Sequence, residues 1–365
     1  MTTDYHHYMQ LPREVIVGNN ILSSVTEVTQ RLNLKGPALI ISGKKSYNTA
    51  GRHIQELLKQ KKIKTQTIII NTKTNSNNSS NSPTTENMTS NIEQKIAKLK
   101  PQVLLAIGGG SIIDLTKISS HKQGIPFISI PTTISHDGIA SPLASIKQET
   151  NKPYSIITQA PLAIIADTDA ISQAPWRSVI SGCGDIIAKY TSVKDWNLAH
   201  IENKEYYGEY AANLAQMSAK LITKNAKQIQ PKDTDSLHMI LEALISCGVS
   251  MSIAGSSRPC SGAEHLFSHA LDIISPNHAM HGEQVGVGTI LTAYLQEANW
   301  EQIRETLKQI GAPTTAKELG VKDEDVIKAL EMAPTIRPER YTILHKLQPD
   351  YETCKKVTKE TKIID

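Results

Sequence analysis

The chain has 365 residues and a formal net charge of +4, with 39% hydrophobic, 20% charged and only 4% aromatic residues. This length predicts two domains, and this composition excludes global disorder while requiring a mostly aliphatic core. Lysines and arginines are interleaved with acids, without the dense basic stripe that a nucleic-acid-binding surface needs, so we expect no nucleic-acid partner.

The cysteines and the N-terminal residues indicate in which cellular compartment the protein is expected. The cysteines form neither a CxxC pair nor a disulfide framework, which favours a reducing environment; they are Cys183, Cys247, Cys260 and Cys354. The first ten residues are polar and lack the apolar core of a signal peptide. No stretch approaches the roughly 20 apolar residues of a membrane span. We therefore expect a cytoplasmic protein without a membrane span.

The first 165 residues alternate short apolar runs with polar or helical stretches. Strands are expected at 38–42, 66–70, 103–107, 127–130 and 163–167, with helices at 52–61 and 92–99. Continuous aliphatic runs are typical of strands buried on both faces, and the alternation with helices predicts a parallel, doubly wound sheet. Residues 71–91 are rich in Asn, Ser and Thr and indicate a low-complexity surface loop.

From about residue 171 onward, long helical patterns dominate and no convincing strand is found. Helices are expected at 181–203, 205–229, 236–255, 262–274, 282–298, 300–311 and 323–332. The sequence therefore predicts an α/β, parallel-sheet domain over residues 1–165 and an all-α domain over residues 166–365.

A glycine-rich turn follows the strand at 103–107. Gly108, Gly109 and Gly110 would let the backbone approach a phosphate closely, and the helix that follows would present free N–H groups to it. Ser111 and Asp114 have the spacing of a capping box. The pattern differs from the G-x-G-x-x-G of the common dinucleotide fold.

The segment 131–138 also lies just beyond a strand. Its hydroxyl-bearing residues Thr132, Thr133 and Ser135 suit a ligand site at the sheet edge, because ligands bind outside the carboxyl ends of parallel strands. A plain turn favours the same residue types, so the segment alone leaves both readings open.

A candidate metal set lies in the second half. Asp185 follows Gly182-Cys183-Gly184, which we expect to open a helix, and His265 and His269 share one helix face. With His281, one carboxylate and two imidazoles would make three ligands and leave a fourth position for substrate, as in catalytic zinc sites. The alternative is a helix-capping acid with core histidines, and His278 rivals His281; spacing alone leaves these readings open.

Together these motifs carry a resemblance. They are GGGSIID at 108–114, PTTISHDGIASP at 131–142, GCGDIIAK at 182–189, SSRPCSGAEHLFSHALD at 256–272 and HGEQVGVG at 281–288. The chain resembles, over roughly residues 11–300, the group of iron-type alcohol dehydrogenases, glycerol dehydrogenases and 3-dehydroquinate synthases. Within this group it is most similar to the sn-glycerol-1-phosphate dehydrogenase family.

The resemblance implies a dehydroquinate synthase-like architecture, with the active site between the two domains. It implies reduction of dihydroxyacetone phosphate to sn-glycerol 1-phosphate by NADH or NADPH, supplying the backbone of archaeal membrane phospholipids. One divalent metal, usually zinc, would bind to Asp185, His265 and His281, while Asp137, Asp185 and His269 would meet the substrate as catalytic residues. The implied cofactor-binding residues are Gly109, Gly110, Ser111, Ile112, Ile113, Asp114, Thr132, Thr133, Ile134, Ser135 and Ser141.

Two further expectations concern binding. Arg258 is a candidate for the substrate phosphate, since a guanidinium binds phosphate bidentately; an arginine that closes a loop is the alternative. The turn Ser42-Gly43-Lys44-Lys45 lacks the acid that would hold a ribose 2′-hydroxyl, so we expect NADPH to be accepted alongside NADH. A homo-oligomer is expected because such assemblies are common.

Three competing functions remain. A dehydroquinate synthase-like lyase is disfavoured by Asp185, because that family usually has Glu as its first metal ligand, and by the segment SHDGIASP at 135–142. A glycerol dehydrogenase acting on an unphosphorylated polyol is disfavoured by the segment 257–262. A binding protein without activity is disfavoured by the complete ligand set. Consumption of NAD(P)H with dihydroxyacetone phosphate separates all of these from the expected activity.

Overall fold

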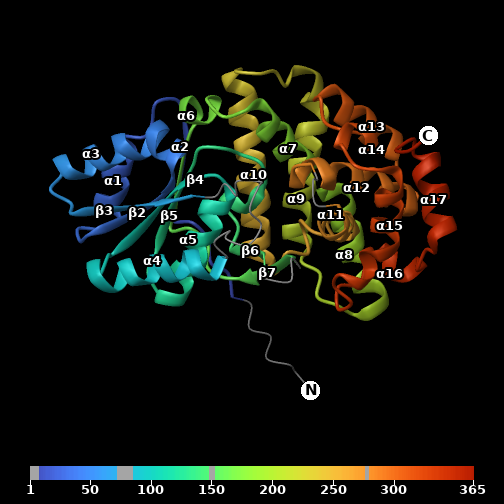
Figure 1. The fold of residues 1–365 in the computed structure, drawn as a ribbon, viewed down its shortest axis with the longest axis horizontal. Helices are drawn as coiled ribbons and strands as arrows, with labels where there is room; N and C mark the ends of the chain where they lie inside the picture. Colours follow the sequence, from blue (N-terminus) through green and yellow to red (C-terminus); the bar gives the residue numbers. More distant parts are fainter. Residues whose placement is uncertain (1–7, 72–84, 148–152, 276–278) are drawn as a thin grey trace.

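The computed structural model describes residues 8–71, 85–147, 153–275 and 279–365, and it has an α/β half beside a helical half (Figure 1). The α/β half, drawn in blue to green, holds a six-stranded sheet in the order β1-β8-β5-β4-β2-β3. All paired neighbours in this sheet run parallel. The strands are β1 (Glu14–Gly18), β2 (Ala38–Gly43), β3 (Thr65–Ile70), β4 (Val103–Gly108), β5 (Phe127–Pro131) and β8 (Ala163–Asp167).

Helices cover both faces of this sheet. In β2, Leu39 and Ile41 belong to one apolar cluster while Ala38 and Ile40 belong to another, because successive side chains point to opposite faces. The first cluster includes residues of α4 (Thr85–Leu99) and α5 (Gly110–Gln123), and the second includes residues of α1 (Ser24–Arg31) and α3 (Arg52–Gln60). The doubly wound arrangement predicted from the continuous aliphatic runs is therefore confirmed.

Several elements differ from the expectations. The edge strand β1 and an antiparallel hairpin of β6 (Leu143–Lys147) and β7 (Pro153–Ile157) were not predicted. The loop expected at 71–91 is wrong for residues 85–91, which form the first turns of α4; residues 72–84 lie outside the described residues. Between β2 and α3 the chain is already helical, in α2 (Lys44–Ser46) and the π-helical turn η1 (Tyr47–Gly51).

Beyond β8 the elements that the structure describes are all helical, as expected. They are α6 (Thr168–Ser172), α7 (Trp176–Ile187), α8 (Lys189–Asn203), α9 (Glu209–Asn225), α10 (Thr234–Ala254), α11 (Ala263–Ile274), α12 (His281–Leu295), α13 (Trp300–Gln309), α14 (Ala316–Leu319), α15 (Asp323–Met332), α16 (Ile343–Leu347) and α17 (Tyr351–Glu360), with short 3-10 turns η3 (Ala226–Gln228) and η4 (Ala333–Thr335). A further 3-10 turn, η2 (Asp137–Ile139), lies earlier in the chain, between β5 and β6. The single helix expected at 181–203 is two helices.

Helix α10 has 21 residues and is apolar enough to cross a membrane by length and composition, which the expectation of no such stretch overlooked. However, 72% of its most apolar window is buried inside the protein, and Figure 1 shows the helix between the two halves. We conclude that most of the apolar surface of α10 packs in the core of this chain.

Candidate active site

The three expected metal ligands come from three different helices and meet at one point. Asp185 lies near the end of α7, His265 in the first turn of α11, and His281 at the first residue of α12. One ligand atom from each lies within 4.8 Å of the other two, and Asp185 Oδ1 is 3.4 Å from His265 Nε2. A divalent ion fits such a set of one carboxylate and two imidazoles. The rival residue His278 lies outside the described residues.

The neighbours of this set orient its nitrogens. His265 Nδ1 lies 2.8 Å from a carboxylate oxygen of the buried Glu264, which turns Nε2 toward Asp185. A carboxylate behind a histidine ligand is a common arrangement that fixes the ring and its tautomer. Burial, together with the charge of His265, lowers the pKa of His281 to about 3, so this imidazole is neutral and has a lone pair for a metal.

Close packing of two helices places Asp185 beside His281. A Cβ on Gly184 would lie 2.2 Å from the carbonyl oxygen of Gly282, and a Cβ on Gly282 would lie 1.8 Å from that of Ser181. These glycines therefore allow α7 and the start of α12 to touch backbone to backbone. The expectation that the Gly-Cys-Gly-Asp run opens a helix is wrong, because α7 begins at Trp176 after Pro175.

A buried lysine links the candidate metal ligands to Asp137, which the sequence predicted to meet the substrate. Lys189 Nζ is 3.0 Å from Asp185 Oδ1 and 2.9 Å from Asp137 Oδ2, and the lysine is fully buried. Burial alone would raise the pKa of Asp185, but the charge of Lys189 holds it well below its ordinary value. Asp137 N–H also donates to Asp185 Oδ2 at 2.8 Å, so the structure brings both predicted carboxylates together.

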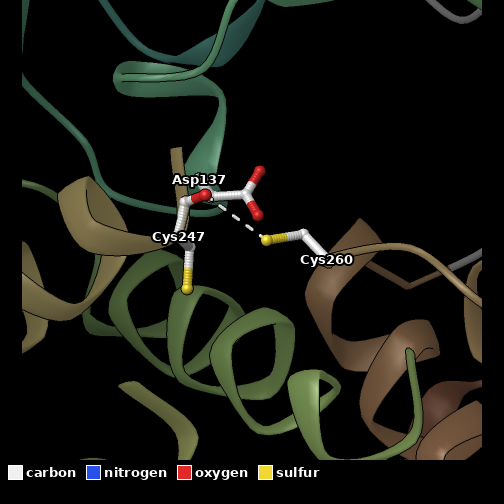
Figure 2. Close-up of side chains that lie close together, drawn as sticks. All are labelled: Asp137, Cys247 and Cys260. Atoms are coloured by element: carbon white, nitrogen blue, oxygen red, sulfur yellow. Dashed lines mark hydrogen bonds between the residues drawn. The ribbon is translucent and has the colours of Figure 1, made fainter. Parts of the chain in front are cut away.

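A second cluster of possible ligands lies nearby. Figure 2 shows Asp137, Cys247 and Cys260, whose ligand atoms also lie within 4.8 Å of one another. The Cys260 thiol donates to the Cys247 carbonyl at 3.4 Å, and burial raises the pKa of Cys260 well above its ordinary value. A metal needs the thiolate form, and the Lys189 ammonium already balances Asp137. The Asp185 set therefore fits an ion better than this cluster does.

A cavity of about 90 Å³ opens beside the metal set, and Asp137, His265, His269 and His281 all line it. His269 is buried, its Nδ1 has no hydrogen-bond partner among the described residues, and burial holds its pKa well below the ordinary value. A buried polar atom without a partner is rare and indicates a ligand position. A larger cavity of about 790 Å³ lies between β1, α9 and α10, but none of these four residues lines it.

The glycine-rich turn and the segment 131–138 meet at the carboxyl edge of the sheet. Gly109 is the residue before α5, and a Cβ on it would lie 2.6 Å from Thr133 Oγ1. Thr132 N donates to the Gly108 carbonyl at 3.0 Å, and Thr132 Oγ1 is 2.9 Å from Ser46 Oγ, just beyond β2. The ends of β2, β4 and β5 thus form one edge, as the parallel topology predicts.

The remaining expected cofactor residues differ in exposure. Ile112, Ile113 and Ile134 are buried in the core, so only their backbone could face a cofactor, whereas Ser111 is exposed. Ser135 accepts from Ser181 through its carbonyl at 3.0 Å.

The capping box expected from Ser111 and Asp114 is wrong, because α5 begins after Gly109. Asp114 instead lies 3.1 Å from Lys117 Nζ, which also reaches Ser141 Oγ at 3.4 Å. Asp114 and Ser141 therefore share a buried lysine, and both line the cavity.

Arg258, the expected phosphate ligand, uses its guanidinium group in hydrogen bonds within the protein. Its Nε donates to Glu205 Oε1 at 2.6 Å, its Nη2 pairs with the other oxygen of Glu205, and its Nη1 donates to the Tyr341 carbonyl at 2.7 Å. The guanidinium fork is thus used within the protein, which matches the alternative of a loop-closing arginine. Its role as the phosphate ligand is not supported by this geometry.

Sequence reasoning missed four residues around the site: Lys189, Glu264, Arg337 and Arg340. The first lies one helical turn after Asp185 and the second directly precedes His265, so adjacency to the candidate ligands was the available signal. No local signal distinguished the two arginines, which lie beyond α15; Arg337 lines the cavity, and Arg340 bonds to Ser257 and Ser261, which line it.

Comparison with known proteins identifies relatives of this chain. A family model described as iron-containing alcohol dehydrogenase matches residues 16–175. The chain is 49% identical over 362 residues to the glycerol-1-phosphate dehydrogenase (NAD(P)+) of Thermococcus kodakarensis, covering 98% of this chain and 99% of that one. It is 47% identical over 358 residues to the protein of that name from Methanosarcina mazei, covering 98% and 97%. The fold is similar to that of glycerol dehydrogenase from Schizosaccharomyces pombe, with a TM-score of 0.79 at 19% identity over 98% and 92% of the two chains.

Proposed function

The chain belongs to the family of NAD(P)-dependent glycerol-1-phosphate dehydrogenases, and we propose that it catalyses the reversible reduction of dihydroxyacetone phosphate to sn-glycerol 1-phosphate. It is thus an oxidoreductase whose product supplies the glycerophosphate backbone of membrane phospholipids. The observation that carries this proposal is that Asp185, His265 and His281 converge beside a cavity. They do so in a chain that is 49% identical to the relative from Thermococcus kodakarensis over 98% of its residues.

We propose that Asp185, His265 and His281 hold one divalent ion, with zinc as the preferred metal. When bound, this ion supplies a positive charge that polarises the substrate carbonyl oxygen. The protein contributes the arrangement of the ligands: Glu264 orients His265, and the glycine contact between α7 and α12 positions Asp185 beside His281. Lys189 keeps Asp185 ionised, as a metal ligand must be.

The cofactor is proposed to bind at the carboxyl edge of the sheet, in the domain formed by residues 1–165. Gly109, Gly110 and the first N–H groups of α5 would hold its phosphates, with Thr132 and Thr133 beside them. NADH or NADPH supplies the hydride in this proposal. Lys44 lies exposed just beyond β2, where a carboxylate would repel a 2′-phosphate, which supports use of both cofactors.

The substrate is proposed to meet Asp137 and His269 in the cavity. Because His269 is neutral and its Nδ1 has no hydrogen-bond partner in the part of the chain that the structure describes, it suits a hydrogen bond with a hydroxyl of the substrate. Asp137 is held by Lys189 and lies at the cavity wall. These two residues are our candidates for positioning the substrate and delivering the proton that completes the alcohol.

We further propose that the protein is cytoplasmic and forms a homo-oligomer. The four cysteines are free and buried, which suits a reducing compartment. Exposed apolar residues Val15, Met217 and Leu221 line the larger cavity and would be covered in an assembly of copies.

The test follows NAD(P)H absorbance with dihydroxyacetone phosphate, before and after chelation and after zinc is returned, and then determines the chirality of the product. We expect metal-dependent oxidation that yields the sn-1 phosphate. In the unaltered enzyme, zinc should restore the activity lost on chelation, whereas His265→Ala should stay inactive when zinc is returned. The matched control is His121→Ala, which changes an exposed histidine of α5 and should behave as the unaltered enzyme does. Turnover of unphosphorylated dihydroxyacetone alone would move the chain to polyol dehydrogenation, and turnover unaffected by chelation would contradict the metal role.

A further inference from the structure

Two buried polar residues lie behind His281, one of the three candidate metal ligands. Ser268 belongs to α11 and Gln284 to α12, and both residues are fully buried. Ser268 Oγ lies 3.4 Å from His281 Nδ1, and the Ser268 hydroxyl donates to Gln284 Oε1 at 2.8 Å. A chain of hydrogen bonds therefore runs from Gln284 through Ser268 to the imidazole ring.

The orientation of the Gln284 amide is fixed at its other end. Gln284 Nε2 donates to the Ala279 carbonyl at 3.1 Å, so the amide oxygen Oε1 faces Ser268. The flipped amide would bring Oε1 against that carbonyl, and two acceptors would then face each other in the buried interior, which is unfavourable. Because Oε1 can only accept, the single hydroxyl hydrogen of Ser268 is used toward Gln284.

This hydrogen-bond assignment determines the role of each ring nitrogen of His281. Since the Ser268 hydroxyl hydrogen is given to Gln284, Ser268 Oγ offers only lone pairs to the imidazole and accepts from its Nδ1–H. An imidazole that binds a metal is neutral, so only one of its nitrogens carries a hydrogen. A hydrogen on Nδ1 leaves the lone pair on Nε2, which is then the nitrogen available to a metal ion.

We propose that Ser268 and Gln284 are positioning residues that fix the tautomer of His281 and present its Nε2 to the divalent ion. Histidine ligands are commonly oriented by donation of the other ring N–H to a fixed acceptor. The two histidines of the set are then held differently, His265 by the Glu264 carboxylate and His281 by a neutral chain. The inference rests on the proposed metal site and names residues that control its affinity.

The test measures the zinc affinity of the full chain, after chelation, by competition with a chelating dye. Ser268→Ala removes the acceptor of His281 Nδ1–H and should weaken zinc binding by roughly tenfold to a hundredfold, as is usual for residues that orient metal ligands. Gln284→Met removes Oε1, which frees the Ser268 hydroxyl to donate to Nδ1 and favours the tautomer that cannot bind the metal through Nε2. This second variant should therefore weaken zinc binding to a similar extent.

The matched control is Ser119→Ala in α5. Ser119 is a fully buried helical serine whose hydroxyl has no hydrogen-bond partner in the part of the chain that the structure describes. Its zinc affinity should equal that of the unaltered protein. A merely structural role of Ser268 or Gln284 would lower the Tm measured without zinc and leave the zinc-induced rise in Tm unchanged, whereas we expect that rise to shrink in both variants.

A double variant shows whether the two residues act as one chain. If they do, the protein carrying both Ser268→Ala and Gln284→Met should bind zinc about as weakly as the weaker-binding single variant, because either change alone already breaks the chain. Independent effects would instead multiply, and that result would overturn the inference. Either single variant decides if the other does not fold.

His281→Ala separates failure of this inference from failure of the proposed metal site. If His281→Ala loses zinc while Ser268→Ala and Gln284→Met bind it as tightly as the unaltered protein, the metal site stands and the positioning role is overturned. If the unaltered protein binds no zinc, or His281→Ala binds it equally well, the proposed metal site fails and the inference fails with it.

Discussion

Gly184→Ala tests whether the close contact between α7 and α12 positions the proposed metal ligands. The new Cβ would lie 2.2 Å from the Gly282 carbonyl oxygen and 3.1 Å from its carbonyl carbon, and backbone atoms cannot rotate away. Ordinary contact begins near 3.4 Å, so the helices must separate by about an ångström. Overpacking of this kind destabilises by about 1–3 kcal/mol, whereas alanine in an unobstructed helix stabilises by roughly 0.5–1 kcal/mol over glycine. The two effects have opposite signs, so the measured direction distinguishes them.

The assay is urea and thermal unfolding, together with a zinc titration. We expect Gly184→Ala to lower Tm by roughly 2–4 °C for each kcal/mol lost and to weaken zinc binding, because Asp185 and His281 adjoin the two glycines. The matched control is Gly286→Ala in α12, where the Cβ would lie 3.2 Å from a carbon of the flexible Leu307 side chain and 3.8 Å, an ordinary contact distance, from Gly184 Cα. This control should be neutral or slightly stabilising. A Gly184→Ala protein as stable as the unaltered one, with the same zinc affinity, would refute the reasoning.

Three further predictions concern single charged groups. Burial raises the pKa of Asp195 to about 7 from an ordinary 3.8, so its protonation stabilises the fold fully below about pH 4 and this contribution is lost as the pH rises through about 7. Asp195→Asn should therefore make Tm depend less on pH between about pH 4 and 7. If Tm changed equally with pH in the variant and in the unaltered protein, the raised pKa of Asp195 would be contradicted. Lys44→Glu should raise KM for NADPH roughly tenfold more than KM for NADH, and an unchanged ratio of the two constants would argue against a 2′-phosphate near this turn. Lys189→Met leaves Asp137 and Asp185 without their buried cation and should lower the free energy of unfolding by about 3–5 kcal/mol in urea; a loss below about 1 kcal/mol would mean that the carboxylates are balanced otherwise.

The parallel sheet was predictable from the sequence because its inner strands are buried on both faces. The runs that form β2, β4, β5 and β8 contain almost no polar residue, and such runs occur where helices cover both sides of a sheet. β1 escaped prediction because an edge strand is covered less evenly, and its residues are mostly half-buried. The hairpin of β6 and β7 packs beside α5 rather than in the sheet, so it followed neither pattern.

The residue types of the candidate metal set could be chosen from the sequence, but their meeting in space could not be predicted. Spacing placed His265 and His269 on one face of α11, yet Asp185 and His281 join them only through the crossing of α7 and α12. That crossing depends on Gly184 and Gly282, which allow a contact between segments distant in the sequence. In the local sequence, the glycines before Asp185 instead predicted that a helix begins there, which is wrong. Lys189 illustrates the same limit, because a lysine one turn after an acid usually forms a solvated pair, whereas this one is fully buried.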